Sequence, residues 1–261
     1  MKEPAVSVLI FKALPGPYVR FQDPPSLQFE TDLVRASLGN GQLALRLKTP
    51  ITSETDAVAA VAPLLQAWEI RSGLRAGRPE IQFEFQRAEY IDLDPDGPGP
   101  HKKIAVSRTL AVAVDSVLER VSTEYPEPPL DFAVDPDVEA LWQRYQDYKS
   151  RNEPLLAMAY FCHTVFVALG GGNKRAAAKS FQVDQSVLRQ LSELTSIRGT
   201  KLTARKVDSQ FTGRPLTMRE EEWVDAAVRL MIRRLGEARA GQFLRPLKMP
   251  DLPNLGLVVE R

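Results

Sequence analysis

The sequence predicts an α+β protein in which an N-terminal antiparallel sheet with one packed helix is followed by an all-helical half. Alternating apolar side chains are concentrated in the first half, and apolar side chains spaced three and four residues apart dominate the second. A proline-rich stretch separates the two patterns. We therefore expect a sheet domain over 1–124, a linker over 125–136, a helical domain over 137–240 and an extended proline-rich tail over 241–261.

The first half contains short segments with the alternation of strands. Residues 5–11 are apolar on both faces, which predicts a central or covered strand. The strand-like runs 33–38 and 42–48 are joined by Gly39, Asn40 and Gly41. Because these three residues tolerate the positive φ angles of tight loops, we expect a hairpin there.

One helix is predicted within this sheet half. Ser53 opens a capping-box pattern, and apolar residues follow at helical spacing over 54–72. Pro63 lies inside this segment, so we expect a kink or an early break. Two longer strands are expected around 81–85 and 104–114, which gives a sheet of about five or six strands.

An acidic loop lies between these two strands. Residues 92–97 match the first six positions of an EF-hand calcium loop, in which alternating carboxylates converge on the ion. Lys103 occupies the position of the bidentate glutamate, and strands are expected where an EF-hand has helices. The pattern favours an acidic hairpin tip over a calcium site.

Charge is divided unequally along the chain. The formal net charge is +1, but residues 1–134 sum to −4 and residues 135–261 to +5. This asymmetry indicates that only the second half would approach an anionic partner.

Helical patterns begin at Asp135, which caps a segment expected to end near Ser150. The longest apolar run covers 155–169 and is stopped by three glycines at 170–172. Because a membrane-spanning helix needs about 20 apolar residues, we expect this run to be a buried core helix and predict no membrane association.

The next segment predicts two short helices joined by a tight turn. Asn173 caps a helix over 174–181, and a second helix is expected over 185–196. Ala178 is the expected small residue at the helix crossing, and the further apolar positions of this pattern are Phe181, Val183, Leu188 and Leu191. Residues 174–196 resemble the helix-turn-helix of phage repressors and related bacterial regulators.

The resemblance implies binding to double-stranded DNA. The residues that would face the major groove are Gln185, Ser186, Arg189 and Gln190, and those that would lie along the phosphates are Lys174, Arg175 and Lys179. Gln182 stands where such motifs usually have glycine, at a cost of about 1 kcal/mol for a left-handed residue.

Basic residues cluster around this motif. Residues 174–206 carry a net charge of +6, and Arg198 and Lys201 extend the expected nucleic-acid-binding set. Because phosphate neutralisation supplies most non-specific DNA affinity, a basic cluster that overlaps a helix-turn-helix favours DNA binding more than either feature alone.

The last long helix is marked by a capping box that begins at Thr217. A broad apolar stripe runs from Trp223 to Leu235, and we expect the helix to end at Gly236. The stripe predicts packing into the core, or alternatively a homodimer through the Trp223–Leu235 helix.

The residue types of known catalytic and metal sites are scarce. Two histidines, His101 and His163, and one cysteine, Cys162, do not supply a usual zinc ligand set, and residues 170–175 lack the ends of a P-loop. We therefore expect no metal and no cofactor, and the sequence favours a protein that is not an enzyme.

The lone cysteine and the short apolar N-terminal run predict a cytoplasmic protein. Phrases such as 249–253 are typical of bacterial proteins but indicate no family.

Three hypotheses remain open from the sequence. The first is a DNA-binding protein that uses residues 174–206. The second is a non-catalytic scaffold or interaction protein in which the same helices are core architecture, so that Gln185, Arg189 and Gln190 would be buried. The third is an enzyme with a dispersed site.

Overall fold

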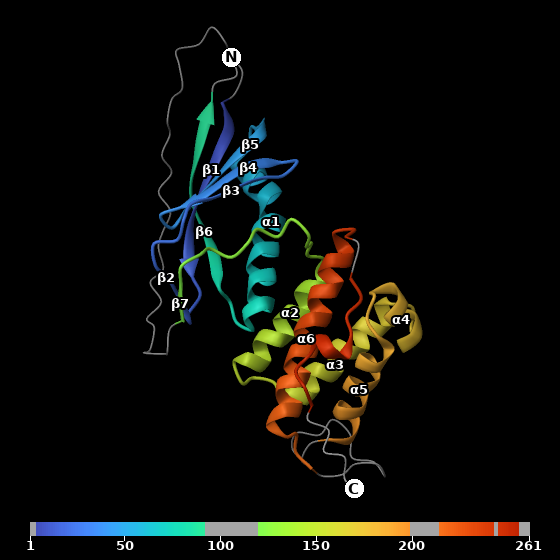
Figure 1. The fold of residues 1–261 in the computed structure, drawn as a ribbon. Coiled ribbons are helices and arrows are strands. Elements are labelled where there is room, and N and C mark those ends of the chain that lie inside the picture. The colour runs from blue at the N-terminus through green and yellow to red at the C-terminus, as the bar shows by residue number, and fades with distance from the viewer. Residues whose placement is uncertain (1–3, 92–119, 199–213, 243–244, 256–261) are drawn as a thin grey trace. The chain divides into compact units, whose positions relative to one another are not determined.

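The computed structural model describes residues 4–91, 120–198, 214–242 and 245–255 (Figure 1). The chain divides into two compact units, Met1–Leu130 and Asp131–Arg261, which we call the sheet unit and the helical unit. The predicted α+β class is confirmed, with an antiparallel sheet and its helix first and the helices after it. The strand expected at 104–114 and the acidic loop at 92–97 lie outside the described residues.

Within the described residues, five strands form the antiparallel sheet of the sheet unit, in the order β3-β4-β5-β1-β6. They are β1 (Ala5–Pro15), β3 (Leu27–Glu30), β4 (Val34–Gly39), β5 (Gln42–Ile51) and β6 (Ile81–Ile91). β1 lies between β5 and β6 and is buried on both faces, as its apolar pattern predicted. β2 (Val19–Phe21) pairs in parallel with β7 (Arg120–Ser122), a pairing that the sequence did not predict.

The predicted hairpin joins β4 to β5. Asn40 and Gly41 have φ angles of 51° and 69°, so both hold the left-handed conformation that the turn requires. The Gly41 amide donates a hydrogen bond to Tyr125 Oη at 2.9 Å. The turn is thereby tied to a distant part of the same unit.

The helix α1 (Glu54–Ala76) covers one face of the sheet and continues past Pro63, so the expected early break is wrong. Its buried face offsets the hydrogen bond that proline removes. Trp68 is fully buried in this face, with its ring 5.0 Å from that of Phe83 and its indole N–H donating to the Pro126 carbonyl at 3.0 Å.

The helical unit contains five α-helices in the described part of the chain. They are α2 (Pro136–Lys149), α3 (Leu155–Leu169), α4 (Lys174–Ser180), α5 (Gln185–Ile197) and α6 (Met218–Arg239), followed by a 3-10 turn, η1 (Met249–Asp251). α3 contacts all four other α-helices and buries residues such as Met158, Cys162 and Phe166. The prediction of a core helix at 155–169 is confirmed.

No single helix of the described residues has both the length and the apolar composition of a membrane span. α3 and α4 meet that test only as a pair, bent by 76° at the glycines between them.

The capping box at Thr217 is present, and the apolar stripe of α6 is buried within the fold, including Trp223 and Leu235. The stripe is therefore core packing. α6 does not end at Gly236 but continues to Arg239. Gly236 instead allows α6 to pack closely against Phe132, because a Cβ atom there would lie 2.1 Å from the Phe132 ring.

The tail lies against the helical unit. Val183 and Leu247 form a parallel β-bridge, and Leu247 and Leu252 are buried. The described residues 245–255 of the predicted tail therefore lie across the helical half.

Candidate nucleic-acid interface

The predicted helix-turn-helix is built from α4, a four-residue connection that contains the turn, and α5. The Asn173 side chain accepts a hydrogen bond from the Ala176 amide at 2.9 Å and so begins α4. Phe181 ends it and is buried against Phe166 of α3, with ring centroids 4.4 Å apart. Asp184 then begins α5 by accepting a hydrogen bond from the Ser186 amide at 2.8 Å.

The small residue with the closest packing is Ala177 rather than Ala178, which corrects the sequence prediction by one position. Ala177 is fully buried, whereas Ala178 is half-buried. A Cβ atom added to Gly170 would lie 2.4 Å from Ala177 Cα, so the C-terminal end of α3 and α4 approach each other closely at this pair.

The turn has the conformation expected of a helix-turn-helix. Gln182 has a φ angle of 51°, the left-handed conformation predicted for this position. Its side chain donates to the Lys179 carbonyl at 3.0 Å, which partly compensates a backbone cost of about 1 kcal/mol. The turn residues are also paired with the tail, because Leu247 donates to the Gln182 carbonyl and accepts from the Asp184 amide, both at 2.8 Å.

α5 has one buried and one exposed face. Val187, Leu188 and Leu191 are fully buried, while Gln185 and Arg189 are exposed. The exposed residues lie one turn apart at the N-terminal half of the helix, which is the part that contacts base edges in helix-turn-helix proteins.

The remaining groove-facing candidates are less accessible. Gln190 is half-buried. Ser186 is also half-buried, and its hydroxyl donates to Asp184 Oδ1 at 2.8 Å, so it contributes to the cap of the helix. These hydrogen bonds from Ser186 lower the pKa of Asp184, and the charges of Lys248 and Arg189 lower it further.

The phosphate candidates divide into two groups. Arg175 and Lys179 of α4 are exposed. Lys174 is half-buried and donates to Ser192 Oγ at 2.8 Å, so it joins the start of α4 to α5. Arg175 and Lys179 therefore remain candidate phosphate contacts, whereas Lys174 belongs to the packing of α4 against α5.

Arg198 is engaged inside the protein. Its Nε and Nη2 atoms lie 3.1 and 2.8 Å from Glu220 Oε1, and both side chains are largely shielded from solvent. Although burial alone raises the pKa of Glu220, hydrogen bonds from Thr217 and Arg198 bring it below its usual value. Arg198 thus joins the end of α5 to α6. The other predicted contact of this region, Lys201, lies outside the described residues.

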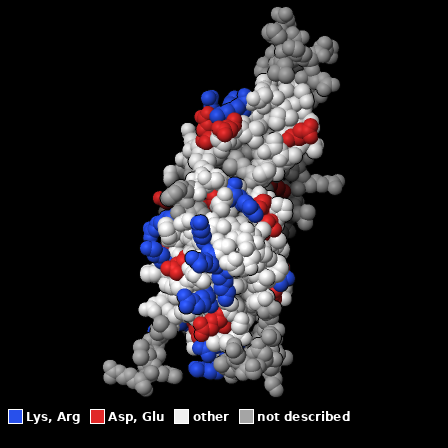
Figure 2. Space-filling view, turned by 90° about the vertical axis from the view of Figure 1, so that its right-hand side faces the viewer, with Lys and Arg blue, Asp and Glu red and all other residues white. Residues whose placement is uncertain are grey.

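Figure 2 looks onto the side of the helical unit on which α4 and α5 lie in Figure 1. Several Lys and Arg side chains gather on this face, with Asp and Glu side chains among them. The surface is therefore basic but not uniformly so, which agrees with the positions of Asp184 and Glu193 close to Arg189 in the sequence.

Cys162 and His163 of α3 are both buried and do not form a reactive pair. Burial raises the pKa of the Cys162 thiol to about 12. Burial also lowers the pKa of His163 to about 4, with a further lowering by Lys174 and an opposing backbone hydrogen bond with Leu188. The described residues contain no group of three His, Cys, Asp or Glu side chains arranged to hold a metal ion.

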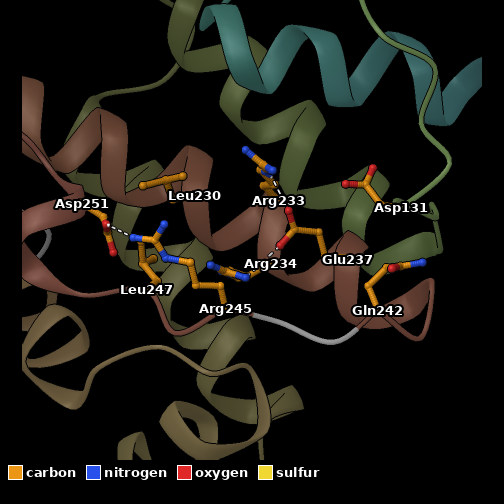
Figure 3. A pocket seen from close by; sticks show the side chains of 9 residues that line it. All are labelled: Asp131, Leu230, Arg233, Arg234, Glu237, Gln242, Arg245, Leu247 and Asp251. Carbon is orange, nitrogen blue, oxygen red and sulfur yellow. Dashed lines mark hydrogen bonds and ion pairs between the residues drawn. The ribbon is translucent and has the colours of Figure 1, made fainter.

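A pocket of about 350 Å³ opens between α6 and the tail (Figure 3). Arg233 and Arg234 both reach Glu237, at 2.6 and 3.0 Å, and Arg245 reaches Asp251 at 3.3 Å. With Asp131 these side chains place three arginines against three carboxylates, so the lining has no formal excess of either charge.

Sequence patterns missed two contributions to this region. The pairing of Leu247 with the turn had no local signal, because Leu247 stands alone among prolines and basic residues. The ion pair of Arg198 depends on Glu220, which the sequence identified only as part of a capping box. No family model matches the chain, and no curated protein and no solved structure is significantly similar to it.

Proposed function

We propose that the helical unit binds double-stranded DNA through α4, the turn and α5. The observation that carries the proposal is the division of α5: its apolar face is buried, while Gln185 and Arg189 are exposed at its N-terminal half. The scaffold hypothesis predicted burial of Gln185, Arg189 and Gln190, of which only Gln190 is half-buried. In the proposed complex, Arg189 reads a guanine edge, and Arg175 and Lys179 lie along the phosphates.

Non-specific binding provides the first test. We expect a labelled random-sequence duplex to bind the protein, with affinity that falls steeply between about 50 and about 200 mM salt in fluorescence anisotropy. Lys179→Gln removes one phosphate contact and should reduce the magnitude of the logarithmic salt slope by about one. Arg189→Ala should instead reduce the preference for a selected duplex over a scrambled one by about tenfold.

The matched control is Arg151→Gln. Arg151 is exposed in the loop before α3, and α4 follows the opposite end of α3, a helix length of about 22 Å away. This variant changes the net charge by the same amount and should leave the salt slope unchanged. Equal slopes for the protein, Lys179→Gln and Arg151→Gln would contradict the proposed phosphate contact, and no binding at micromolar protein would favour the scaffold hypothesis.

A further inference from the structure

The tail is joined to the turn of the helix-turn-helix by backbone hydrogen bonds. Leu247 donates to the Gln182 carbonyl and accepts from the Asp184 amide, both at 2.8 Å, and its side chain is 3% exposed. The bonded residues flank Val183, which is itself buried. The position of Leu247 is therefore fixed relative to the first residues of α5.

The tail is also held in shape by its own side chains. Asp251 accepts a hydrogen bond from the Lys248 amide at 2.8 Å, and its other oxygen lies 3.3 Å from Arg245 Nη2 (Figure 3). Leu252 is buried directly after this turn. The Lys248 side chain remains exposed on a backbone that is anchored on both sides.

Lys248 carries its charge to the N-terminal end of α5. Its ammonium group lies close enough to lower the pKa of Asp184, the residue that begins the helix. Asp184 is exposed and places a negative charge where the proposed complex brings DNA phosphates. A lysine beside this carboxylate offsets its charge and adds an exposed cation to the proposed DNA contacts Arg175, Lys179 and Arg189.

We propose that the segment Arg245–Asp251 is part of the DNA-binding surface, in which Leu247 supports the turn and Lys248 contacts a backbone phosphate beside the N-terminus of α5. This inference rests on the proposed function and extends it to a tail that the motif itself does not include. The contact is with phosphate, so it adds affinity without sequence preference.

The test compares duplex binding by the full chain, Lys248→Gln, Lys179→Gln and the control Arg151→Gln. Lys248 is exposed, so we expect Lys248→Gln to keep the thermal unfolding midpoint of the parent. Between about 50 and about 200 mM salt, the affinity of the parent and of the variant should both fall. The fold-loss of the variant should be about 3.5 times smaller than that of the parent, as expected for the loss of one phosphate contact. Arg151→Gln should behave like the parent.

A second background separates a phosphate contact from simple compensation of Asp184. Asparagine also caps helices well, so Asp184→Asn removes the carboxylate charge and keeps the start of α5. We expect Lys248→Gln to reduce the salt slope in this background too. An effect that disappears there would overturn the phosphate contact.

The outcomes also distinguish this inference from the proposed function. If Lys248→Gln has the same salt slope as the parent while Lys179→Gln has a smaller one, the role of the tail is overturned and the proposed function stays in place. Absence of duplex binding by the parent would overturn both.

Discussion

His163 lies in the middle of α3 with its Nε2 atom buried and without a hydrogen-bond partner among the described residues. Burial lowers the pKa of His163, the charge of Lys174 of α4 lowers it further, and the backbone at Leu188 of α5 opposes this shift. A proton on this imidazole would be buried next to a positive charge. The histidine is therefore compatible with the folded helical unit only in its neutral form.

This arrangement predicts acid sensitivity. The pKa of His163 is about 4 in the folded protein, below the unfolded value of about 6.5, so the unfolded chain binds the proton first as the pH falls. The contribution of His163 is fully present above about pH 6.5 and is lost as the pH falls towards 4. From pH 7 to 5 this group should cost about 2 kcal/mol of unfolding free energy.

Urea unfolding at the two pH values measures this loss, and His163→Leu supplies the control. Leucine fills similar space and does not titrate, so the difference between pH 7 and pH 5 should be smaller for the variant by about the same 2 kcal/mol. If both proteins lose the same free energy, His163 does not cause the acid sensitivity.

The basic residues show which side-chain properties a sequence pattern predicts and which it does not. Spacing placed Lys174, Lys179 and Arg198 in one basic cluster, but only Lys179 has an exposed side chain. Lys174 and Arg198 bind Ser192 and Glu220, partners contributed by other helices. Sequence spacing along a helix does not specify such tertiary partners.

At the scale of elements, α3 and α4 are joined by a close contact that admits no side chain at Gly170. A Cβ atom there would lie 2.4 Å from Ala177 Cα and 3.0 Å from the Phe181 ring. Backbone and ring cannot both move away without separating the helices. The glycine is thus required by packing, whereas the sequence explained it only as a helix stop.

Gly170→Ala should therefore destabilise the helical unit by about 1 to 3 kcal/mol, the usual cost of overpacking a core. Hydrogen exchange of α4 amides, together with the thermal midpoint, measures the effect where it arises. Unchanged protection in α4 would show that the contact relaxes without cost.

The predicted elements were most accurate where a capping residue or a turn residue gives a specific local signal. The hairpin at Asn40–Gly41, the cap at Asp135 and the capping box at Thr217 are all present. Pro63 and Gly236 were read as breaks, but burial of the surrounding helix faces carries α1 and α6 past them. Local propensity is overridden where tertiary packing contributes more free energy than the breaker costs.

At the scale of the whole molecule, the unequal charge of the two halves predicts which residues DNA would protect in the proposed complex. The first 134 residues carry a net charge of −4 and the remainder +5. An acidic sheet unit is repelled by a polyanion, so the contact should be confined to the helical unit.

Hydrogen–deuterium exchange with and without duplex measures this directly. We expect slower exchange in residues 174–190 and 245–251 and no change in β1, β4, β5 and α1. Protection of the sheet unit would contradict a contact confined to the helical unit.

The pairing of Leu247 with Gln182 and Asp184 has a consequence for the order of folding. These bonds join residues on either side of α5 and α6, so they close a long loop, and long-range contacts of this kind form late because of the entropy of closure. On a chain synthesised from its N-terminus, α4 and α5 leave the ribosome before Leu247 does. The turn between them is therefore completed only after α6 has been made, and a nascent chain that already contains both helices still lacks the backbone bonds that hold the turn in place.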